Sequence, residues 1–405
     1  MRECDALVIG GGPAGATAAI LLARAGWSVI VIEAARFPRR KVCGEFLSGT
    51  SLPLLDRLGV GEDFRALAGP PVTYVGLFAG EATVSAPLPS ADGVFGRALG
   101  REQLDTLLLT RARESGADVL QPATATAFAT DGDGFVCNVA WNEASGGNDR
   151  PVAISARIVI AAHGSWAPGS LPTQPRRRAP RASDLLGFKA RFDRTRLAPG
   201  LMPLLAYPGG YGGMVHVGDG QTSFSCCVRR DRLQSIRAAT HGEAGEGVRA
   251  HIERSCRGVR EALAGSRQDG SWLATGPIRP GLRLSSSNGI FSIGNAAGEA
   301  HPVVAEGISM AIQGAALLVH RLLPCRGATR GSSDLSDAGA RYARDWRRAF
   351  RGRVAASAFV AGWAMRPSLT SASLPILRAL PRVLTLGARL AGKGTRFAGI
   401  LRCQA

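Results

Sequence analysis

The sequence lacks the cysteine spacing of a metal site or a disulfide framework. Its eight cysteines are scattered along 405 residues, and no two of them form a Cys-x-x-Cys pair. This distribution argues against a zinc site and against structural disulfides, so we expect a reduced, cytoplasmic protein without a bound metal. The first predicted strand begins at residue 4, which leaves no room for a signal peptide.

Inspection of the sequence also indicates no apolar run long enough to span a membrane. A membrane-spanning helix requires about 20 apolar residues. The longest candidate, Val354–Met365, is shorter than that, so we expect no transmembrane helix. The composition is otherwise that of a globular protein, with 45% hydrophobic and 20% charged residues. The length is sufficient for two or three lobes with a sizeable core.

Acidic residues are scarce near the C-terminus. The formal net charge is +18, and residues 341–405 contain 13 Lys and Arg but a single acid. Helices are predicted over Arg341–Met365 and Leu374–Phe397. The basic residues near one face of the second helix are Arg378, Arg382, Arg389, Lys393 and Arg396. Such a helix either lies on an anionic membrane surface or packs on the protein with a solvated basic face, and Pro375 and Pro381 weaken both alternatives.

The first 33 residues contain the features of a dinucleotide site. A buried strand is predicted over Cys4–Ile9, and the glycine-rich turn Gly10–Gly15, with the sequence GGGPAG, follows directly. A helix is predicted over Ala16–Ala25. The next apolar strand, Ser28–Ile32, ends at Glu33. This strand–turn–helix–strand order with a terminal acid predicts a bound dinucleotide.

Each residue type in this unit has a physical role. Gly10 allows the tight turn, Gly12 lets the backbone approach a pyrophosphate, and Gly15 lets the helix pack close to the strand. The pyrophosphate sits on the N-terminus of the helix. Glu33 accepts hydrogen bonds from ribose hydroxyls, which favours FAD or NAD over NADP.

A second strand–turn–helix arrangement lies about 280 residues further on. The strand Gly289–Ile293 precedes the turn Gly294–Gly298, and a helix is predicted over Ser309–His320. Asn295 is placed to bond a ribityl chain. The helix N-terminus near Gly307 is placed to direct its free N–H groups at an electron-rich ring oxygen.

Further strands and helices are predicted between these two units. The strands are Asp118–Leu120, Phe135–Trp141, Val152–Ile160, Leu185–Arg191, Met214–Val217 and Thr222–Arg229, and the helices are Asp105–Ser115 and Glu246–Ala264. Arg101 opens the first of these helices and is either a pyrophosphate ligand or an exposed arginine. The run Arg176–Arg178 lies in the loop Pro168–Ser183 and is expected to be solvated, so we predict no nucleic-acid partner.

Together these segments resemble the FAD-dependent oxidoreductases of the aromatic-hydroxylase (group A flavoprotein monooxygenase) and geranylgeranyl-reductase-like superfamily. The resemblance covers roughly residues 1–325. It rests on RKVCGE at Arg40–Glu45, on GNAAG at Gly294–Gly298 and on EGI at Glu306–Ile308. The segment Tyr207–Gly213, YPGGYGG, looks like the part of the family that lines the substrate side of the flavin.

The resemblance implies an α/β fold with a glutathione-reductase-type, Rossmann-like FAD domain and an inserted antiparallel substrate domain. The FAD domain would comprise residues 1–71, 97–183 and 276–330, the substrate domain 72–96 and 184–275, and a basic helical region 331–405. The implied cofactor-binding residues are Gly10, Gly12, Pro13, Ala14, Gly15, Glu33, Lys41, Cys43, Gly44, Arg101, Gly294, Asn295, Ala296, Gly307 and Ile308.

Two positions depart from the family pattern. Asn295 replaces the usual Asp of the second turn, which retains hydrogen bonding but removes a charge. His163 stands where the family has an Asp linked to FAD and nicotinamide binding, which puts the usual NADPH route in doubt, and it is alternatively a loop-capping residue. The Trp-x-Trp-x-Ile-Pro signature of flavin-dependent halogenases is absent, so we set that reading aside.

The resemblance implies an FAD-dependent, NAD(P)H-using monooxygenase that hydroxylates a hydrophobic phenolic or polyketide-type molecule of secondary metabolism with O2. The compact substrate lobe favours this reading over a reductase of isoprenoid or lipid double bonds. A non-catalytic FAD-binding subunit is a third alternative. No nucleophile or general-base dyad is needed, because the cofactor carries the hard step. Cys43, either packing or redox-active, and His216 and Tyr211, orienting a phenolic hydroxyl, are the candidate catalytic side chains.

Overall fold

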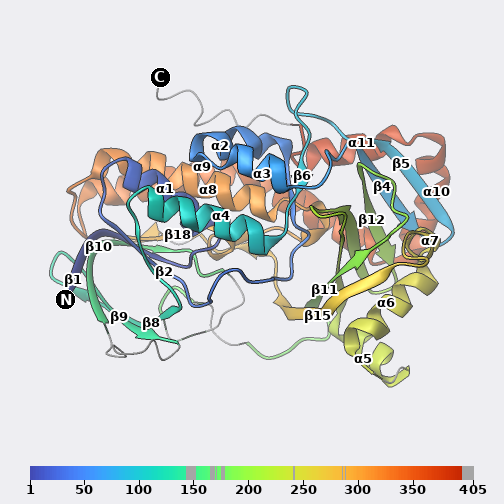
Figure 1. Cartoon of the computed structure of the whole chain (residues 1–405), viewed down its shortest axis with the longest axis horizontal. Helices are drawn as coiled ribbons and strands as arrows, with labels where there is room; N and C mark the ends of the chain where they lie inside the picture. Colours follow the sequence, from blue (N-terminus) through green and yellow to red (C-terminus); the bar gives the residue numbers. More distant parts are fainter. Residues whose placement is uncertain are drawn as a thin grey trace.

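The computed structural model describes residues 1–142, 152–164, 169, 171–174, 178–239, 242–284, 286–287 and 289–394. Arg176, Arg177 and Arg396, which were assigned to solvated basic surfaces, lie outside the described residues. Figure 1 shows two sheets side by side, with long helices over the first and a second group of helices at the far end.

The first sheet is built around the N-terminal strand. β1 (Arg2–Ile9) lies between β10 (Val152–Ala161) and β2 (Val29–Ile32), and both pairings are parallel. The order is β17-β18-β10-β1-β2-β7, extended through antiparallel β9 and β8. The remaining strands of this sheet are β7 (Asp118–Leu120), β8 (Ala123–Asp131), β9 (Gly134–Trp141), β17 (Ser286–Ser287) and β18 (Ile290–Ser292). β2 reads Val-Ile-Val-Ile and is buried throughout, as expected for a parallel strand covered on both faces.

Three helices cover one face of this sheet. They are α1 (Pro13–Arg24), α4 (Arg101–Glu114) and α8 (Gly307–Leu322) (Figure 1). Their apolar faces share one core with α9 (Ser333–Ala364), through Tyr342, Trp346 and Phe350. The predicted strand and helix positions of this half are therefore confirmed, with ends that differ by a few residues.

The second sheet takes strands from two separate parts of the chain. Its order is β15-β11-β14-β13-β12-β4-β5. The strands are β4 (Tyr74–Ala79), β5 (Ala82–Pro87), β11 (Leu185–Asp193), β12 (Leu201–Tyr207), β13 (Gly210–His216), β14 (Thr222–Arg229) and β15 (Arg267–Ile278). All pairs are antiparallel except β12 with β4. The chain therefore enters this sheet twice, as the resemblance implied, while the residue limits of the domains stay predictions.

The single helix expected over Glu246–Ala264 is wrong. Two helices, α6 (Ala244–Ser255) and α7 (Arg257–Ala262), meet at Cys256, whose backbone is extended. The Cys256 thiol donates to the carbonyls of Phe78 and Ala206 at 3.5 and 3.4 Å. This tertiary contact with the second sheet interrupts a segment whose local pattern is continuous.

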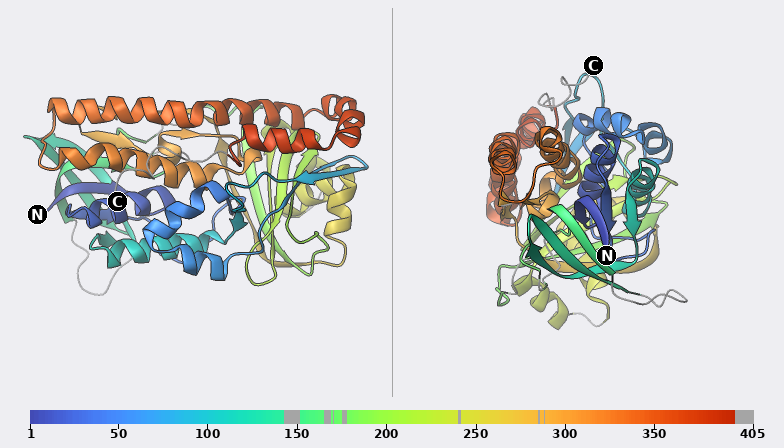
Figure 2. Two further views of the ribbon diagram at one scale, coloured as in Figure 1. Left: turned by 90° about the horizontal axis from the view of Figure 1, so that it is seen from above. Right: turned by 90° about the vertical axis from the view of Figure 1, so that its left-hand side faces the viewer.

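The C-terminal region forms three helices. α9 (Ser333–Ala364) runs along one long side of the molecule, and α10 (Pro367–Ala379) and α11 (Arg382–Leu390) lie at its end beside the second sheet (Figure 2). The one helix expected from Leu374 onward is wrong, because the chain breaks at Leu380–Pro381, whereas Pro375 is accommodated inside α10.

One described helical segment, Gly307–Cys325, has the length and apolar composition of a membrane span. Our expectation that no run reaches this length was therefore wrong. Within the protein, 72% of its apolar window is buried, because α8 packs on α1 and α9 in the main core. Its apolar character is thus accounted for by the core.

Candidate functional site

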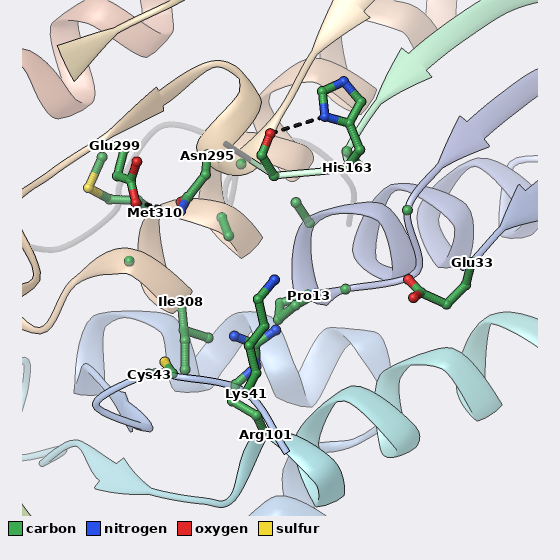
Figure 3. Close-up of a pocket in the computed structure, with 18 of the residues that line it drawn as sticks. Pro13, Glu33, Lys41, Cys43, Arg101, His163, Asn295, Glu299, Ile308 and Met310 are labelled. Atoms are coloured by element: carbon green, nitrogen blue, oxygen red, sulfur yellow. Dashed lines mark hydrogen bonds between the residues drawn. The ribbon is translucent and has the colours of Figure 1, made fainter. Parts of the chain in front are cut away.

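An elongated cavity of about 580 Å³ opens at the carboxyl ends of the first sheet's strands (Figure 3). Thirteen of the fifteen predicted cofactor-binding residues line it. They are Gly10, Gly12, Pro13, Ala14, Glu33, Lys41, Cys43, Gly44, Arg101, Gly294, Asn295, Gly307 and Ile308. Gly15 and Ala296 lie behind this lining. The structure therefore brings together segments that are almost 300 residues apart.

The glycine-rich turn leaves the N-terminus of α1 open to the cavity. Gly12 is the N-cap residue and provides no side-chain cap, and Pro13 occupies the first helical position. Gly10 has φ of +110°, and a Cβ at Gly15 would lie 1.8 Å from the Gly10 carbonyl oxygen. Only glycine fits this close approach, so the free N–H groups of the first turn face the cavity.

Glu33 is held firmly at the end of β2. Its Oε2 accepts from the Gly11 N–H at 2.7 Å and its Oε1 from the Ala35 N–H at 2.9 Å. Arg39 Nε lies 3.8 Å from the same carboxylate. The side chain is buried at the cavity edge, where sequence reasoning placed a ribose ligand.

The second turn contains an acid that sequence reasoning missed. Asn295 Nδ2 donates to Glu299 Oε1 at 3.0 Å, and Arg283 Nη2 lies 3.5 Å from Glu299 Oε2. Glu299 is buried and lines the cavity. It returns to this part of the cavity a carboxylate that Asn295 lacks. Its only sequence signal was an acid four residues after Asn295.

The N-terminus of α8 is the second uncapped helix end in the cavity. No side chain caps it, and a Cβ at Gly307 would have nothing within 4 Å. The partial positive charge of this helix end is therefore open to an electron-rich group.

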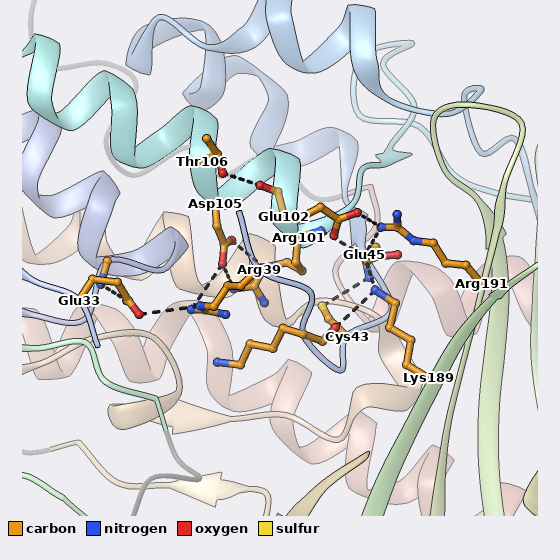
Figure 4. A network of polar contacts seen from close by, with 12 residues as sticks. Glu33, Arg39, Cys43, Glu45, Arg101, Glu102, Asp105, Thr106, Lys189 and Arg191 are labelled. Carbon is orange, nitrogen blue, oxygen red and sulfur yellow. Dashed lines mark hydrogen bonds and ion pairs between the residues drawn. The ribbon is translucent and has the colours of Figure 1, made fainter. Parts of the chain in front are cut away.

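Arg101 is buried over the first turn rather than exposed. Its Nε and Nη2 each lie 2.7 Å from the Asp105 carboxylate (Figure 4). Burial opposes its charge, but Asp105 outweighs this effect and raises the pKa of Arg101. Arg39 Nη2 lies 3.7 Å from the same carboxylate. With Lys41, these two arginines make three cations around the cavity lining.

A buried ion cluster joins this cavity to the second sheet (Figure 4). Glu45 pairs with Lys189 of β11, and Arg191 Nη2 lies 3.0 Å from Glu45 Oε1. The Arg101 N–H donates to the same oxygen at 3.1 Å. Burial opposes ionisation of Glu45, but Lys189 and Arg191 outweigh it and lower the pKa of Glu45. Sequence reasoning missed this cluster, although a lone lysine in a buried strand was a signal.

A second cavity of about 400 Å³ adjoins the first. Val42, Cys43, Gly44, Pro302 and Ala305 line both. The second sheet contributes Met202, Leu204, Tyr211, Met214 and Cys226, and the C-terminal helices contribute Trp363, Leu377 and Leu384. Among the described residues around it, Lys393 is the one charged side chain, so this is an apolar chamber.

The candidate catalytic residues are placed differently. Cys43 lies at the junction of the two cavities. Tyr211 lines the second cavity, and its Oη lies 3.2 Å from Nδ1 of His301. His216 lines neither cavity and instead contacts the Leu197 carbonyl at 2.9 Å and the Thr222 hydroxyl at 3.2 Å. Its position offers no contact with a substrate, so the proposed orienting role is corrected to a structural one.

His163 lines the first cavity close to the glycine-rich turn. Its Nδ1 lies 3.0 Å from the Gly164 carbonyl oxygen, the contact of a loop-capping residue. Burial lowers the pKa of His163, which favours the neutral ring. Both alternatives weighed for this residue remain compatible with its position.

Lys393 does not belong to a solvated basic face. It is buried, lines the second cavity and lies 3.2 Å from Glu306. Arg378, Arg382 and Arg389 are exposed as expected. Among the described residues, no group of three or more His, Cys, Asp or Glu side chains is placed to hold a metal ion.

Two open helix ends, three cations and a fixed acid surround one elongated cavity, and this arrangement defines the class of dinucleotide-binding flavoproteins. A model of the FAD binding domain family matches residues 3–343. The chain therefore belongs to this FAD-binding family, and the superfamily resemblance is confirmed.

The relatives with known names include both a reductase and a monooxygenase. The chain is 34% identical over 170 residues to a menaquinone reductase of Mycobacterium tuberculosis, covering 41% of this chain and 39% of that protein. It is 28% identical over 348 residues to 6-methylpretetramide 4-monooxygenase of Streptomyces rimosus, covering 82% and 77%. The match therefore spans about two fifths of the first relative's length and most of the second's.

The fold is shared with solved flavoproteins. The myxobacterial chondrochloren halogenase, an FAD-dependent halogenase, superposes with a TM-score of 0.75 at 19% identity, covering 97% of this chain and 91% of that one. This similarity confirms the predicted α/β architecture, with its additional sheet and C-terminal helices.

Proposed function

We propose that the protein is an FAD-dependent, NAD(P)H-using monooxygenase that hydroxylates a hydrophobic phenolic or polyketide-type small molecule. The observation that carries this proposal is the apolar second cavity, which adjoins the FAD cavity at Cys43 and Gly44. An apolar molecule bound there would remove water from one charged side chain, Lys393, whose charge is already paired with Glu306. Its compact volume of about 400 Å³ suits a fused ring system.

The first cavity fits FAD on the geometry of its own residues. The α1 N-terminus, Lys41 and Arg101 would hold the pyrophosphate, and Glu33 the adenosine ribose. Asn295 and the α8 N-terminus would face the other end of the cofactor. When bound, FAD would supply electron transfer from NAD(P)H and activation of O2.

The chain itself orients the substrate and excludes water. The apolar walls keep the reacting region dry, which protects reactive species from side reactions with water. Tyr211 provides a fixed polar contact within these walls, because burial raises its pKa well above the usual range and keeps the phenol protonated. Its contact with His301 fixes the direction of the hydroxyl.

A reductase acting on isoprenoid or lipid double bonds is the second candidate. The match to a menaquinone reductase favours it. The third candidate, a non-catalytic FAD-binding subunit, rested on Asn295 and His163, and the nearby Glu299 weakens that argument. We also propose a cytoplasmic location, on the basis of the scattered cysteines, of which the seven in the described residues are free thiols.

One experiment separates these functions. The purified flavoprotein is incubated with NADPH or NADH and a mixed extract of aromatic polyketides and isoprenoid lipids under ¹⁸O₂, and the products are analysed by mass spectrometry. A product that carries one ¹⁸O atom supports the monooxygenase. A product that gains two hydrogens and no oxygen atom supports the reductase. If neither NADPH nor NADH reduces the flavin under any condition, the result supports the non-catalytic subunit.

A further inference from the structure

Exposed large hydrophobic side chains are concentrated on the C-terminal helices. Of the twelve such residues in the described chain, seven lie between positions 359 and 390. They are Phe359, Leu369, Ile376, Leu380, Val383, Leu386 and Leu390, and we call them the apolar face. Phe359 is 76% exposed and Leu390 65%. Single exposed apolar residues are ordinary, but a cluster of this kind marks a binding surface.

The part of these helices that follows Asp345 carries positive charge without acids. Arg366, Arg378, Arg382 and Arg389 are exposed among the apolar residues, and no Asp or Glu follows Asp345 in the sequence. An apolar surface bordered by arginines complements an anionic lipid surface. A second copy of the chain is disfavoured as the partner, because it would bring two sets of arginines together.

Two residues of the apolar face also border the second cavity. Phe359 and Val383 line this cavity and are also 76% and 43% exposed. Both come from the helices that lie together on the outer side of the second sheet (Figure 2). The chamber and the apolar face therefore meet at these two side chains.

We propose that the apolar face docks on an anionic lipid bilayer and that the second cavity takes up its hydrophobic ligand from the bilayer, between Phe359 and Val383. Docking requires no step of the proposed oxidation. The docking proposal would hold equally for a reductase. A result that contradicts docking therefore leaves the proposed monooxygenase function standing, and the reverse is also true. The ligand that this route delivers is lipid-soluble, which narrows the substrate class of the proposed enzyme.

The docking test uses the full-length flavoprotein and vesicles of phosphatidylcholine with or without phosphatidylglycerol, separated by sedimentation at low salt. We expect binding to the anionic vesicles. Leu380→Glu with Leu390→Glu should reduce the ratio of bound to free protein at least about tenfold, because neither residue lines the cavity but both belong to the apolar face. Leu67→Glu with Leu282→Glu, at exposed positions elsewhere, is the matched control and should bind as the wild type does.

Charge is tested in the same assay. Arg378→Gln with Arg382→Gln should weaken binding about tenfold or more, whereas Arg237→Gln with Arg254→Gln, two exposed arginines outside the C-terminal helices, should not. Equal binding to neutral and anionic vesicles would overturn the proposal, as would wild-type binding by the Leu380 and Leu390 variant. A dimer in solution that this variant dissociates would overturn it too, because the face would then join two copies.

The uptake route has its own readout. Vesicles loaded with the apolar dye N-phenylnaphthylamine should deliver it to the cavity, where energy transfer from Trp363 reports its arrival. Val383→Phe, which narrows the entrance without adding a tryptophan donor, should slow the arrival of the dye several-fold without changing vesicle binding. An unchanged rate would overturn the route and leave the docking result standing. Trp363→Phe identifies the part of the signal that arises in the cavity.

Discussion

Lys393 Nζ lies 3.2 Å from Glu306 Oε1, although the two residues are 87 positions apart. Both are buried, and Arg353 Nη1 lies 3.5 Å from the other carboxylate oxygen. Glu306 immediately precedes the first turn of α8, at the edge of the FAD cavity. The segment that follows α11 is therefore fixed against the cofactor site and closes one end of the apolar cavity.

Replacing Lys393 tests this attachment. Lys393→Met leaves the buried Glu306 carboxylate with Arg353 as its remaining ion partner, so we expect the free energy of unfolding to fall by about 3 kcal/mol. Urea denaturation measures the change. Arg389→Met removes an exposed charge from the nearby helix and should alter the free energy by no more than about 0.5 kcal/mol. Unaltered stability of the Lys393 variant would contradict a structural role for the pair.

The Glu45–Lys189 pair gives a second stability prediction. Lys189→Met leaves the buried Glu45 with Arg191 as its remaining ion partner, and Glu45→Gln leaves the buried Lys189 without its carboxylate partner, so each should destabilise the protein by about 3 kcal/mol. The double variant should lose clearly less than the sum of the two, because it removes both charges. A double-mutant cycle by urea denaturation measures this coupling. Strict additivity would show that the two side chains do not act as a pair.

Local patterns were sufficient for the dinucleotide-binding unit. β1, α1 and β2 were predicted within a few residues, because buried strands, a glycine turn and a helix are encoded by neighbouring residues. Thirteen of the residues that the same reasoning predicts to bind the cofactor line one cavity. The break at Cys256 was not predictable in this way, because its cause is a contact with strands distant in the sequence.

Buried charges were the main failure of sequence reasoning. The sequence pattern predicts an exposed helical face for Lys393, because its neighbours are basic and the pattern indicates one helix over Leu374–Phe397. The chain instead turns after α11 and meets Glu306, a partner that no local pattern reveals. Lys189 and Glu45 were missed for the same reason, because Lys189 lies in β11 and Glu45 lies in a loop that is distant from it in the sequence.

The second cavity can be filled without disturbing the first. Gly213 lines only the second cavity, and a Cβ there would meet nothing closer than the Pro203 carbonyl oxygen at 3.4 Å. Gly213→Leu should therefore reduce product formation at least about tenfold while FAD affinity stays unchanged. Product is measured by the mass-spectrometric assay and FAD by flavin fluorescence. Gly352→Ala, at an open position of α9, is the control. Full activity of the leucine variant would place the substrate elsewhere.

Lys41 makes FAD binding depend on pH. Burial, with Arg101 and Arg39 nearby, lowers the pKa of Lys41 from 10.5 to about 8. In the free folded protein, the charged lysine therefore disfavours folding below pH 8, and this penalty declines progressively as the pH rises from about 8 to 10.5. A bound pyrophosphate favours the charged form and raises the pKa again, so binding takes up a proton above pH 8.

The FAD affinity should consequently be highest below pH 8 and fall as the pH rises, by up to about tenfold per pH unit. Titrations followed by flavin fluorescence at pH 7, 8 and 9 measure this slope. Lys41→Met should bind FAD about tenfold more weakly at pH 7 and lose the added slope above pH 8, because no proton is taken up at this position. Lys41→Arg keeps its charge throughout and should also lose the slope while retaining affinity. If the methionine variant kept the wild-type slope, another group would be the one that titrates, and Lys41 would not contact the pyrophosphate.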